Sequence, residues 1–384
     1  MLVTGSFPPQ RCGVGDYSAR LAHGLAAEPG VEVAVLTGAD WAADMASVPP
    51  GVTVIPAIPR WTIRHAARAF REIRRWRADV VHLQHPTQGY RDEGLTALIP
   101  AIAFLAGARV VRTWHEPTTW GSLRDWRGVI RFMAQAVIPG AFIVVRPNLR
   151  EMLHPVLRVL PFPRRFRYIP NASTIASANM SEIERERLRH ELRKGQKRLI
   201  VYFGFINAGK GVDQLFEIAD PATDHLVLMG EGEGQRDYHV SICKLAEDPR
   251  WAGKATILGY RGEAEVARVL AAADAVLLPF RAGGGMWNTS IHAARSQGSL
   301  IIATSRNARG WNAAEHTFWA APGDIAGMRA ALAQYVGTRR ARRLLPVPKW
   351  PDIIHAHLAA YRGTDHFRDK PHSSERTVGP AEAR

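Results

Sequence analysis

The sequence is poor in cysteine and has no long uninterrupted hydrophobic run. Cys12 and Cys243 are its only cysteines; they lie far apart and in no metal-ligand spacing, which favours a reducing cytoplasm. The most apolar stretch, residues 95–111, is broken by a proline, a glycine and an arginine, so it predicts a buried helix followed by a strand and not a membrane span. The first residues lack the basic and apolar regions of a signal peptide and are typical of a strand that is short at its front. We therefore expect a cytoplasmic protein.

Acidic residues are fewer than basic ones. The 384 residues include 50 lysines and arginines against 35 aspartates and glutamates, which gives a formal net charge of +15. Such a balance favours anionic partners, namely a nucleotide diphosphate, anionic lipid or nucleic acid. The alternative is that the arginines cover solvated faces and bind no partner. A chain of this length is expected to form two domains.

Short apolar runs alternate with amphipathic segments of helical period along almost the whole chain. This alternation predicts an α/β protein with parallel sheets and helices on both faces. In the first half, strands are predicted at residues 31–37, 52–57, 80–85, 109–115, 142–146 and 167–171, and helices at 16–27, 62–77 and 123–137. In the second half, strands are predicted at 199–203, 226–229, 256–258, 275–279 and 300–304, and helices at 212–218, 237–246, 263–272, 289–296 and 324–335.

A polar and charged stretch, residues 173–197, separates the two halves. We place the domain boundary near Asn171, which gives an N-terminal domain of residues 1–171 and a C-terminal domain of residues 172–350. An amphipathic helix at 351–363 is expected to cross back to the first domain, and residues 364–384 have the composition of a disordered tail. Two such sheets bind ligands at the carboxyl ends of their strands, so the residues just after the strands are the candidates for chemistry.

The first glycine-containing segment, residues 5–17, follows the first strand and opens a helix. Gly13 and Gly15 allow the backbone to approach a ligand closely, and the helix N-terminus offers unpaired N–H groups to a phosphate. The alternative is a tight turn between strand and helix. Asp16 and Tyr17 follow at once; Asp16 is interpreted as a helix cap or as a ligand of an acceptor hydroxyl.

Further strand-end motifs follow in order along the chain. They are Trp114-His115-Glu116-Pro117, Tyr168-Ile169-Pro170-Asn171, the segment from Phe203 to Gly211, Met229-Gly230-Glu231-Gly232 with Leu258-Gly259-Tyr260, and Pro279-Phe280 followed by Gly283-Gly284-Gly285. Together with the first segment they resemble the motifs of family 4 glycosyltransferases, over nearly the whole chain to Tyr361. The resemblance implies the GT-B fold, in which two Rossmann-like doubly wound domains face each other across a cleft. It also implies retaining transfer of a sugar from a nucleotide diphosphate sugar.

Lys210 has the chemistry that this transfer needs. Breaking the bond to the anomeric carbon leaves a diphosphate with extra negative charge, which positioned cations and helix N-termini stabilise. Lys210 supplies a cation, and Gly211 is predicted to begin a helix. The alternative is a solvated surface lysine. Because cationic side chains can replace a metal on the diphosphate, we expect no metal and no cofactor beyond the nucleotide-sugar co-substrate.

The resemblance places the remaining site residues in two groups. His115 would contact the donor sugar and its phosphate, although a structural histidine is the alternative. The residues on the nucleotide-sugar side would be Gly13, Gly15, Gly204, Gly211, Gly259, Tyr260, Gly284, Gly285, Asn288 and Thr289. The acceptor-side residues would be Asp16, Tyr17 and His85, where His85 and His82 alternate along one strand and one of them should face the cleft.

The donor site departs from the family pattern. An arginine that the family carries is Phe205 here, and the paired glutamates of the family correspond to Gly285 and Ala293. The segment from Pro279 to Ser290 resembles a sub-pattern of the family that lacks these glutamates, in which Arg281 would replace the missing arginine. A decayed donor site is the alternative, and the protein would then be a GT-B-like binder of a nucleotide or glycan.

Residues 60–77 form a basic helical pattern with tryptophans near its ends. Ile63, Phe70 and Ile73 share one face and arginines occupy the other. Such a helix can lie on an anionic membrane, although the apolar face must also pack on the sheet, which favours a core helix with a solvated arginine face. No nucleic-acid recognition motif is present. We therefore predict a glycosyltransferase acting on a glycan or lipid-linked acceptor in cell-surface polysaccharide or glycolipid synthesis, cytoplasmic or peripheral on the inner face of the membrane.

Overall fold

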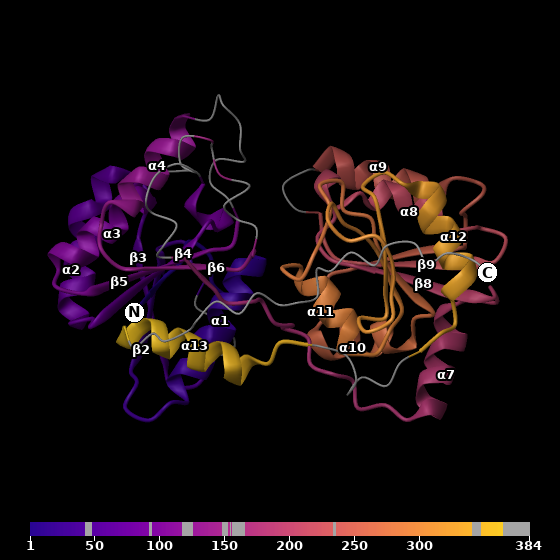
Figure 1. Cartoon of the computed structure of the whole chain (residues 1–384), viewed down its shortest axis with the longest axis horizontal. Coiled ribbons are helices and arrows are strands. Elements are labelled where there is room, and N and C mark those ends of the chain that lie inside the picture. The colour runs from indigo at the N-terminus through magenta and orange to yellow at the C-terminus, as the bar shows by residue number, and fades with distance from the viewer. Residues whose placement is uncertain are drawn as a thin grey trace, which may run out of the picture.

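The computed structural model describes residues 1–42, 48–91, 94–116, 126–147, 153, 155, 166–232, 236–339 and 347–363. They form two α/β halves side by side, each built on a seven-stranded sheet (Figure 1). The strand order is β3-β2-β1-β4-β5-β6-β7 in the first sheet and β10-β9-β8-β11-β12-β14-β13 in the second. All described strand pairs are parallel except β13 with β14. The prediction of two parallel α/β sheets is confirmed.

The strands of the first sheet are β1 (Leu2–Val3), β2 (Val33–Gly38), β3 (Val52–Ile58), β4 (Val80–His85), β5 (Arg109–Trp114), β6 (Ala141–Val144) and β7 (Phe166–Tyr168). Those of the second sheet are β8 (Arg198–Phe203), β9 (Asp224–Met229), β10 (Ala255–Gly259), β11 (Ala275–Leu278), β12 (Ile301–Thr304), β13 (Gly310–Asn312) and β14 (Thr317–Ala320). In both sheets the strand order reverses at the centre, between β1 and β4 and between β8 and β11. Such a reversal is where open α/β sheets bind ligands.

Helices cover both faces of each sheet. In the first half they are α1 (Gly13–Ala26), α2 (Ala66–Trp76), α3 (Leu95–Leu105) and α4 (Trp126–Ala136), with the short 3-10 turn η2 (Ile63–His65) before α2. In the second half they are α7 (Glu182–Leu192), α8 (Leu215–Ile218), α9 (Arg236–Glu247), α10 (Glu263–Ala272), α11 (Thr289–Arg295) and α12 (Ile325–Tyr335), followed by α13 (Trp350–Arg362). The apolar residues 95–111 form helix α3 and the start of strand β5, as predicted.

Helix α13 lies on the first half although its sequence follows the second (Figure 1). Ile354 and Leu358 of this helix join the cluster formed by α1 and β2. Packing is close at Gly24 of α1, where an added Cβ atom would lie 2.5 Å from the Ile354 side chain. At the start of the helix, the Trp350 Nε1 group donates a hydrogen bond of 2.9 Å to the carbonyl oxygen of Ser173. The predicted tail, residues 364–384, lies outside the described residues.

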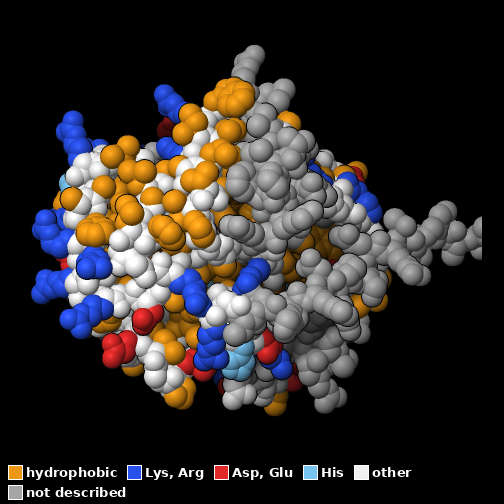
Figure 2. All heavy atoms as spheres, turned by 60° about the vertical axis from the view of Figure 1, so that its left-hand side comes forward, with side chains coloured by type: hydrophobic (Ala, Val, Ile, Leu, Met, Phe, Trp, Pro, Cys, Tyr) orange, Lys and Arg blue, Asp and Glu red, His pale blue; other side chains and the backbone are white. Residues whose placement is uncertain are grey.

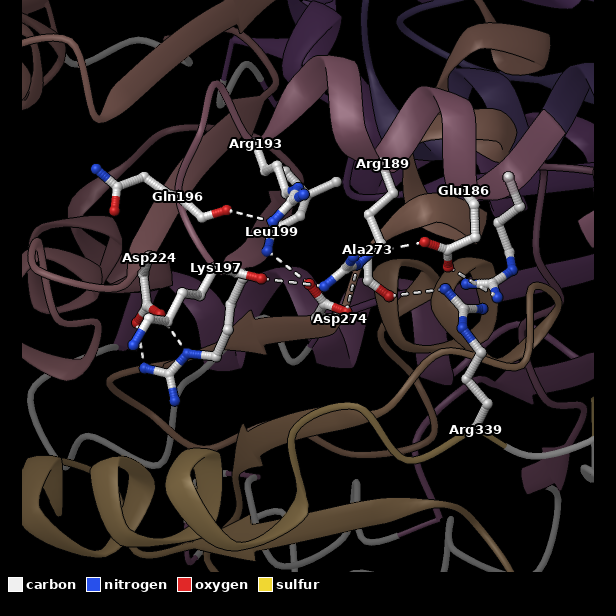
Figure 3. Close-up of polar contacts among 12 residues, drawn as sticks. Glu186, Arg189, Arg193, Gln196, Lys197, Leu199, Asp224, Ala273, Asp274 and Arg339 are labelled. Carbon is white, nitrogen blue, oxygen red and sulfur yellow. Dashed lines mark hydrogen bonds and ion pairs between the residues drawn. The ribbon is translucent and has the colours of Figure 1, made fainter. Parts of the chain in front are cut away.

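The sequence analysis missed α7, because its helix has few apolar residues. Ser181 and Glu184 nevertheless form a capping box, in which each side chain accepts from the other residue's backbone N–H. Figure 3 shows how α7 is held on the second sheet: Arg189 donates through Nε to Asp274 at 2.8 Å, and Asp274 also accepts from the backbone N–H of Leu199. The spacing of serine and glutamate was the available sequence signal.

Three further predictions about elements need correction. Helix α1 begins at Gly13 and not at Asp16, because the Gly-Val-Gly segment itself adopts helical geometry. The predicted helix at 212–218 is a 3-10 turn, η6 (Val212–Gln214), followed by the four-residue α8. The strands β13 and β14 were not predicted; both are short, and β13, at the edge of the sheet, is antiparallel to β14.

Candidate active site between the two sheets

The carboxyl ends of the strands of both sheets lie against each other. Arg11, which follows β1, forms an ion pair with Glu231 after β9, and its guanidinium lies 4.3 Å from the centre of the Tyr260 ring after β10. Asn171, which follows β7, donates a hydrogen bond of 2.9 Å from Nδ2 to the carbonyl oxygen of Trp287. The residues after the strands of one half therefore meet the residues after the strands of the other half.

The loop after β8 carries the predicted phosphate-binding residues. The side chain of Asn207 accepts a hydrogen bond from the backbone N–H of Lys210, and the chain turns at Gly211, whose φ is +67°. A Cβ atom at Gly211 would lie 2.2 Å from the carbonyl oxygen of Pro279, so only glycine permits this approach to the loop after β11. The Lys210 Nζ atom lies 5.2 Å from the centre of the Phe280 ring.

Arg281 is brought beside Lys210 by backbone contacts. Its N–H donates to the carbonyl oxygen of Gly209 at 3.1 Å, and its Nε donates to the carbonyl oxygen of Ala208 at 3.1 Å. Its guanidinium also forms an ion pair with Asp213. These contacts bring Arg281 to the loop that carries Lys210, after the central strands β8 and β11, but the charge of Arg281 is partly neutralised. The helix predicted to begin at Gly211 is only a short turn here, so its dipole adds little to this site.

The glycine-rich loop after β11 is folded around Trp287. A Cβ atom at Gly285 would lie 2.3 Å from the Trp287 ring, and one at Gly284 would lie 2.3 Å from the Phe280 ring. Asn288 accepts through Oδ1 from the backbone N–H of Gly285 at 3.0 Å, so its side chain stabilises this loop. Thr289 is the first residue of α11.

Helix α11 holds the same loop from behind. His292 Nε2 is hydrogen-bonded to the carbonyl oxygen of Met286 at 2.7 Å. Arg295 is fully buried and forms an ion pair of 2.7 Å with Glu315. Ala293, the second position at which the family carries glutamate, is also buried. The sequence analysis missed Trp287 and Arg295, because their contacts join residues that follow different strands.

Across from these loops, His115 follows β5 at the end of the first sheet. Only 6% of the residue is exposed, and Nε2 is hydrogen-bonded to Oε1 of Gln84 at 2.9 Å. Its ring also meets the Tyr17 ring edge to face, with centres 4.8 Å apart. Burial and the neighbouring His357 and His85 lower the pKa of His115 to about 3. His115 is therefore a neutral group, suited to hydrogen bonds with hydroxyls.

Behind His115 lies a buried network of uncharged polar side chains. Both ring nitrogens of His82 are hydrogen-bonded at 2.7 Å, one to the hydroxyl of Tyr361 and one to that of Thr113. Burial lowers the pKa of His82 well below its usual value. His85, predicted to face the cleft, is also buried and stacks on Tyr90 at 6.1 Å. The tight packing of α13 onto the first sheet encloses this network.

The structure changes the interpretation of Asp16 and Tyr17. Asp16 does not cap α1, because the N-cap is Cys12 and Asp16 lies in the first turn. Its side chain is exposed; partial desolvation and the charge of Glu263 raise its pKa to about 6. Tyr17 is buried, and its hydroxyl lies 3.3 Å from Nε2 of His357 in α13. Tyr17 therefore supports the ring of His115 and binds the last helix.

Among the remaining glycines, Gly230 and Gly15 lie close to the backbone of another segment, whereas Gly13 and Gly259 do not. Gly204 has a φ of +147°, and a Cβ atom at its neighbour Gly230 would lie 1.8 Å from the Gly204 carbonyl oxygen. A Cβ atom at Gly13 would lie 3.7 Å from Phe205 of the other half, and one at Gly15 would lie 3.0 Å from the carbonyl oxygen of Ser6. Gly259 has a φ of +70° before the exposed Tyr260. Pro117 of the predicted motif lies outside the described residues.

Two facing doubly wound sheets, with site residues after the strands of both, define the GT-B class. The family model described as Glycosyltransferase Family 4 matches residues 12–173, and the model described as Glycosyl transferases group 1 matches residues 197–337. The chain belongs to the glycosyltransferases of GT-B fold, with a family 4 N-terminal domain and a group 1 C-terminal domain. The expected fold and the expected class of enzyme are thus confirmed.

Solved structures show the same fold over nearly the whole chain. HepE from Anabaena, crystallised with UDP and glucose, has a TM-score of 0.72 at 14% identity and covers 94% of this chain and 98% of its own. Sucrose-phosphate synthase from Thermosynechococcus elongatus has a TM-score of 0.73 at 17% identity, with coverages of 94% and 98%. The catalytic domain of starch synthase IV from Arabidopsis thaliana, bound to ADP and acarbose, has a TM-score of 0.67 at 14% identity, again with 94% and 98%. A search of curated protein sequences found no match.

Proposed function

We propose that the protein transfers a sugar from a nucleotide diphosphate sugar to a glycan or lipid-linked acceptor, with retention of the anomeric configuration. The observation that carries this proposal is that Arg281, after β11, is bonded to the backbone of residues 208 and 209 directly before Lys210, so that both cations follow the two central strands of the second sheet. Structures with the same fold that are bound to UDP, UDP-glucose or ADP support a donor in which a nucleotide carries the sugar. Polysaccharide or glycolipid assembly at the cell surface is the proposed setting.

The two cations would act on the leaving group. Transfer breaks the bond between the anomeric carbon and a phosphate oxygen, forms a bond to the acceptor oxygen, and releases the hydroxyl proton. The negative charge that develops on the diphosphate is stabilised by cations already held in place. Lys210 and Arg281 would share this stabilisation, and the Arg281 guanidinium is at the same time paired with Asp213.

His115 would contact the sugar and not the phosphate. Its low pKa keeps the ring uncharged near neutral pH, and Gln84 fixes one nitrogen. A neutral imidazole accepts or donates a hydrogen bond to a sugar hydroxyl without attracting the diphosphate. His115→Ala should therefore lower turnover more than nucleotide affinity.

A degenerate site that binds nucleotides without transfer is the second candidate. It is favoured by Gly285 and Ala293, which lack the carboxylates of the family; a Cβ atom at Gly285 would meet the Trp287 ring, and Ala293 is buried. The variant-site proposal instead needs no carboxylate here: Arg281 would replace the arginine missing at Phe205, and Asn288 holds the glycine-rich loop.

Donor screening separates the two candidates. Thermal unfolding is measured with UDP, ADP, GDP and their sugars, where a ligand at a hundred times its Kd stabilises the fold by about 2.7 kcal/mol. Release of nucleoside diphosphate is then measured with each stabilising sugar. Binding with no turnover of any sugar nucleotide supports the degenerate site; turnover supports the proposed enzyme, and the anomeric signal of the product in NMR tests retention.

A lipid-linked acceptor would place the enzyme at a membrane surface. None of the described helices is long and apolar enough to cross a bilayer. Transfer to a soluble oligosaccharide, compared with transfer to a lipid-linked one, tests the acceptor class. Equal rates with the soluble and the lipid-linked acceptor would mean that the enzyme does not recognise the lipid part of the acceptor.

A further inference from the structure

Large apolar side chains gather on the outer side of helices α2, α3 and α4. Figure 2 shows this side of the molecule, with hydrophobic atoms over its upper part and basic side chains along its border. We define the apolar face by its exposed members, which are Ile63, Phe70, Phe104, Leu105, Trp126, Ile130 and Val137. Leu105 is 73% exposed and Ile130 is 67% exposed, so these side chains are not part of the core.

The same helices bury other side chains in the core. Helix α2 buries Ala69 and Ile73, and α4 buries Val129, Phe132 and Ala136. Helix α3 contains no charged residue at all, a composition typical of a helix buried on every side. Because α3 packs between α2 and α4, its exposed end and the exposed positions of its neighbours lie on one continuous side. An apolar face of this kind on a soluble domain marks an interaction surface.

Arginines border the apolar face. Arg64, Arg68, Arg71 and Arg75 follow a helical spacing of three and four residues along η2 and α2, and all four are exposed. At about 100° per residue, this stripe faces away from the buried Ala69 and Ile73 and adjoins the side that carries Ile63 and Phe70. None of the ion pairs among the described residues involves these four arginines.

We infer that the apolar face and its arginine stripe dock on an anionic lipid bilayer. Apolar side chains enter the interface between headgroups and acyl chains while arginines bind the anionic headgroups. The sequence pointed only to the arginine helix; the structure adds Phe104, Leu105, Trp126 and Ile130 from two other helices.

A second copy of this chain fits the surface less well. A two-fold dimer brings the same patch of both subunits together, and the arginine stripes would then face each other without acidic partners. A bilayer with anionic headgroups supplies both an apolar phase and the opposite charge. The inference does not depend on glycosyl transfer.

Vesicle co-sedimentation tests the docking. The protein is mixed with vesicles of phosphatidylglycerol and phosphatidylcholine, or of phosphatidylcholine alone, at rising salt. We expect binding to the anionic vesicles, weakening as salt screens the arginines. Leu105→Ser and Ile130→Ser should each weaken binding roughly tenfold, by loss of apolar burial. Arg68→Gln and Arg71→Gln should each weaken it about fivefold.

Helix α7 of the other half offers matched controls. Ile183 is 76% exposed there and Arg187 is exposed as well, so Ile183→Ser and Arg187→Gln should leave vesicle binding unchanged. Thermal unfolding of each variant shows that the fold is intact.

Several outcomes would overturn the inference: equal binding to both kinds of vesicle, binding to neither, or binding unaffected by the Leu105 and Ile130 changes. A dimer in solution that dissociates in the Leu105 variant would assign the face to a second copy. The same variants should transfer sugar to a soluble acceptor at the wild-type rate. Failure of docking is therefore distinguishable from failure of the proposed transfer.

Discussion

The two halves share a topology but treat polar side chains differently where they meet. The first sheet ends in a buried network of histidines, tyrosines, threonine and glutamine that carries no charge, because burial lowers the pKa values of His82, His115 and His357. In the second half charged side chains are paired: Arg281 with Asp213 after the strands, Arg295 with Glu315 behind the glycine-rich loop, and Arg198 with Asp224 at the opposite end of the sheet, where β8 and β9 begin. The uncharged part of the first half is this buried network, whereas the first-half residues that contact the second half include Arg11, paired with Glu231, and Arg146, paired with Glu116.

The difference between the neutral network and the paired charges follows from how histidine and arginine side chains respond to burial. An imidazole loses its proton when desolvated and remains useful in a neutral network, whereas a buried guanidinium stays charged and needs a carboxylate. Figure 3 shows the same rule away from the site, where Arg189 and Asp274 pair at the start of the central strands β8 and β11. The comparison supports the proposal that His115 of the first half binds hydroxyls and that Lys210 and Arg281 of the second half bind the diphosphate.

The largest expected effect comes from breaking a buried pair of the charged half. Glu315→Ala leaves Arg295 buried without its carboxylate, which should lower the free energy of unfolding by about 3–5 kcal/mol. Glu265→Ala removes only the surface partner of Arg261 and should cost about 0–1 kcal/mol. Urea unfolding of both variants measures the difference; equal costs would mean that the second half does not depend on this pairing.

The next test concerns the diphosphate. Lys210→Ala should reduce transfer by roughly a hundredfold to a thousandfold, equivalent to about 2.7–4 kcal/mol of transition-state stabilisation. Lys244→Ala, an exposed lysine on α9, is the matched control. Initial rates of nucleotide release measure both. A Lys210 variant that binds and turns over normally would place the phosphate site elsewhere.

Gly285 tests the contact between the halves at Trp287. Gly285→Ala adds a Cβ atom 2.3 Å from the Trp287 ring, and the displaced ring should cost roughly 1–3 kcal/mol of stability. Because Arg146 lies 5.1 Å from the centre of that ring, tryptophan fluorescence should change as well. Unchanged stability and fluorescence would show that the loop accommodates a Cβ atom at this position.

The neutral network predicts acid sensitivity. His357 has a folded pKa of about 4, below the ordinary value of 6.5, so the unfolded chain binds a proton first as the pH falls. Stability from this group is complete above pH 6.5 and is lost towards pH 4, by about 1.4 kcal/mol per pH unit. His357→Gln should make the pH dependence of unfolding shallower by that amount. His355→Gln, on the exposed side of α13, reports the effect of the substitution itself.

Asp16 has the opposite effect on how the free energy of unfolding depends on pH. Its folded pKa of about 6 lies above the ordinary value, so it adds stability as the pH falls from 6 towards 4. Asp16→Asn should therefore steepen the loss of stability in acid.

The smallest effect is expected at the contact between the halves. Arg11→Ala removes an exposed ion pair with Glu231 and a ring contact with Tyr260, which together should contribute no more than about 1 kcal/mol to stability. Urea unfolding measures this cost. A much larger loss would mean that the two halves unfold as one unit held by this contact.

Much of the fold could be predicted from the sequence. The alternation of apolar runs and helical periods is local, and it located most strands of both sheets within a few residues. The errors fell where tertiary contacts decide. Helix α7 is polar and is held on the sheet by the contact of Arg189 with Asp274, while β13 and β14 are short strands at one side of the second sheet with little pattern of their own.

The candidate site was only partly predictable. The motifs after the strands located Lys210, Arg281 and His115, and the structure brings the first two together; their catalytic roles stay predictions. The sequence did not show that Arg281 is paired with Asp213, or that Asp16 lies inside the first turn and not at the cap.

By itself the sequence determined the alternation of strands and helices, the glycines that allow turns after them, and the excess of basic side chains. The tertiary structure decided which polar groups are charged and which surfaces remain uncovered. Tyr361 lies 279 residues after His82, yet its hydroxyl is hydrogen-bonded to the His82 ring because α13 returns to the first half. Because desolvation depends on packing between such distant segments, no local pattern reveals the neutral network or the exposed apolar face.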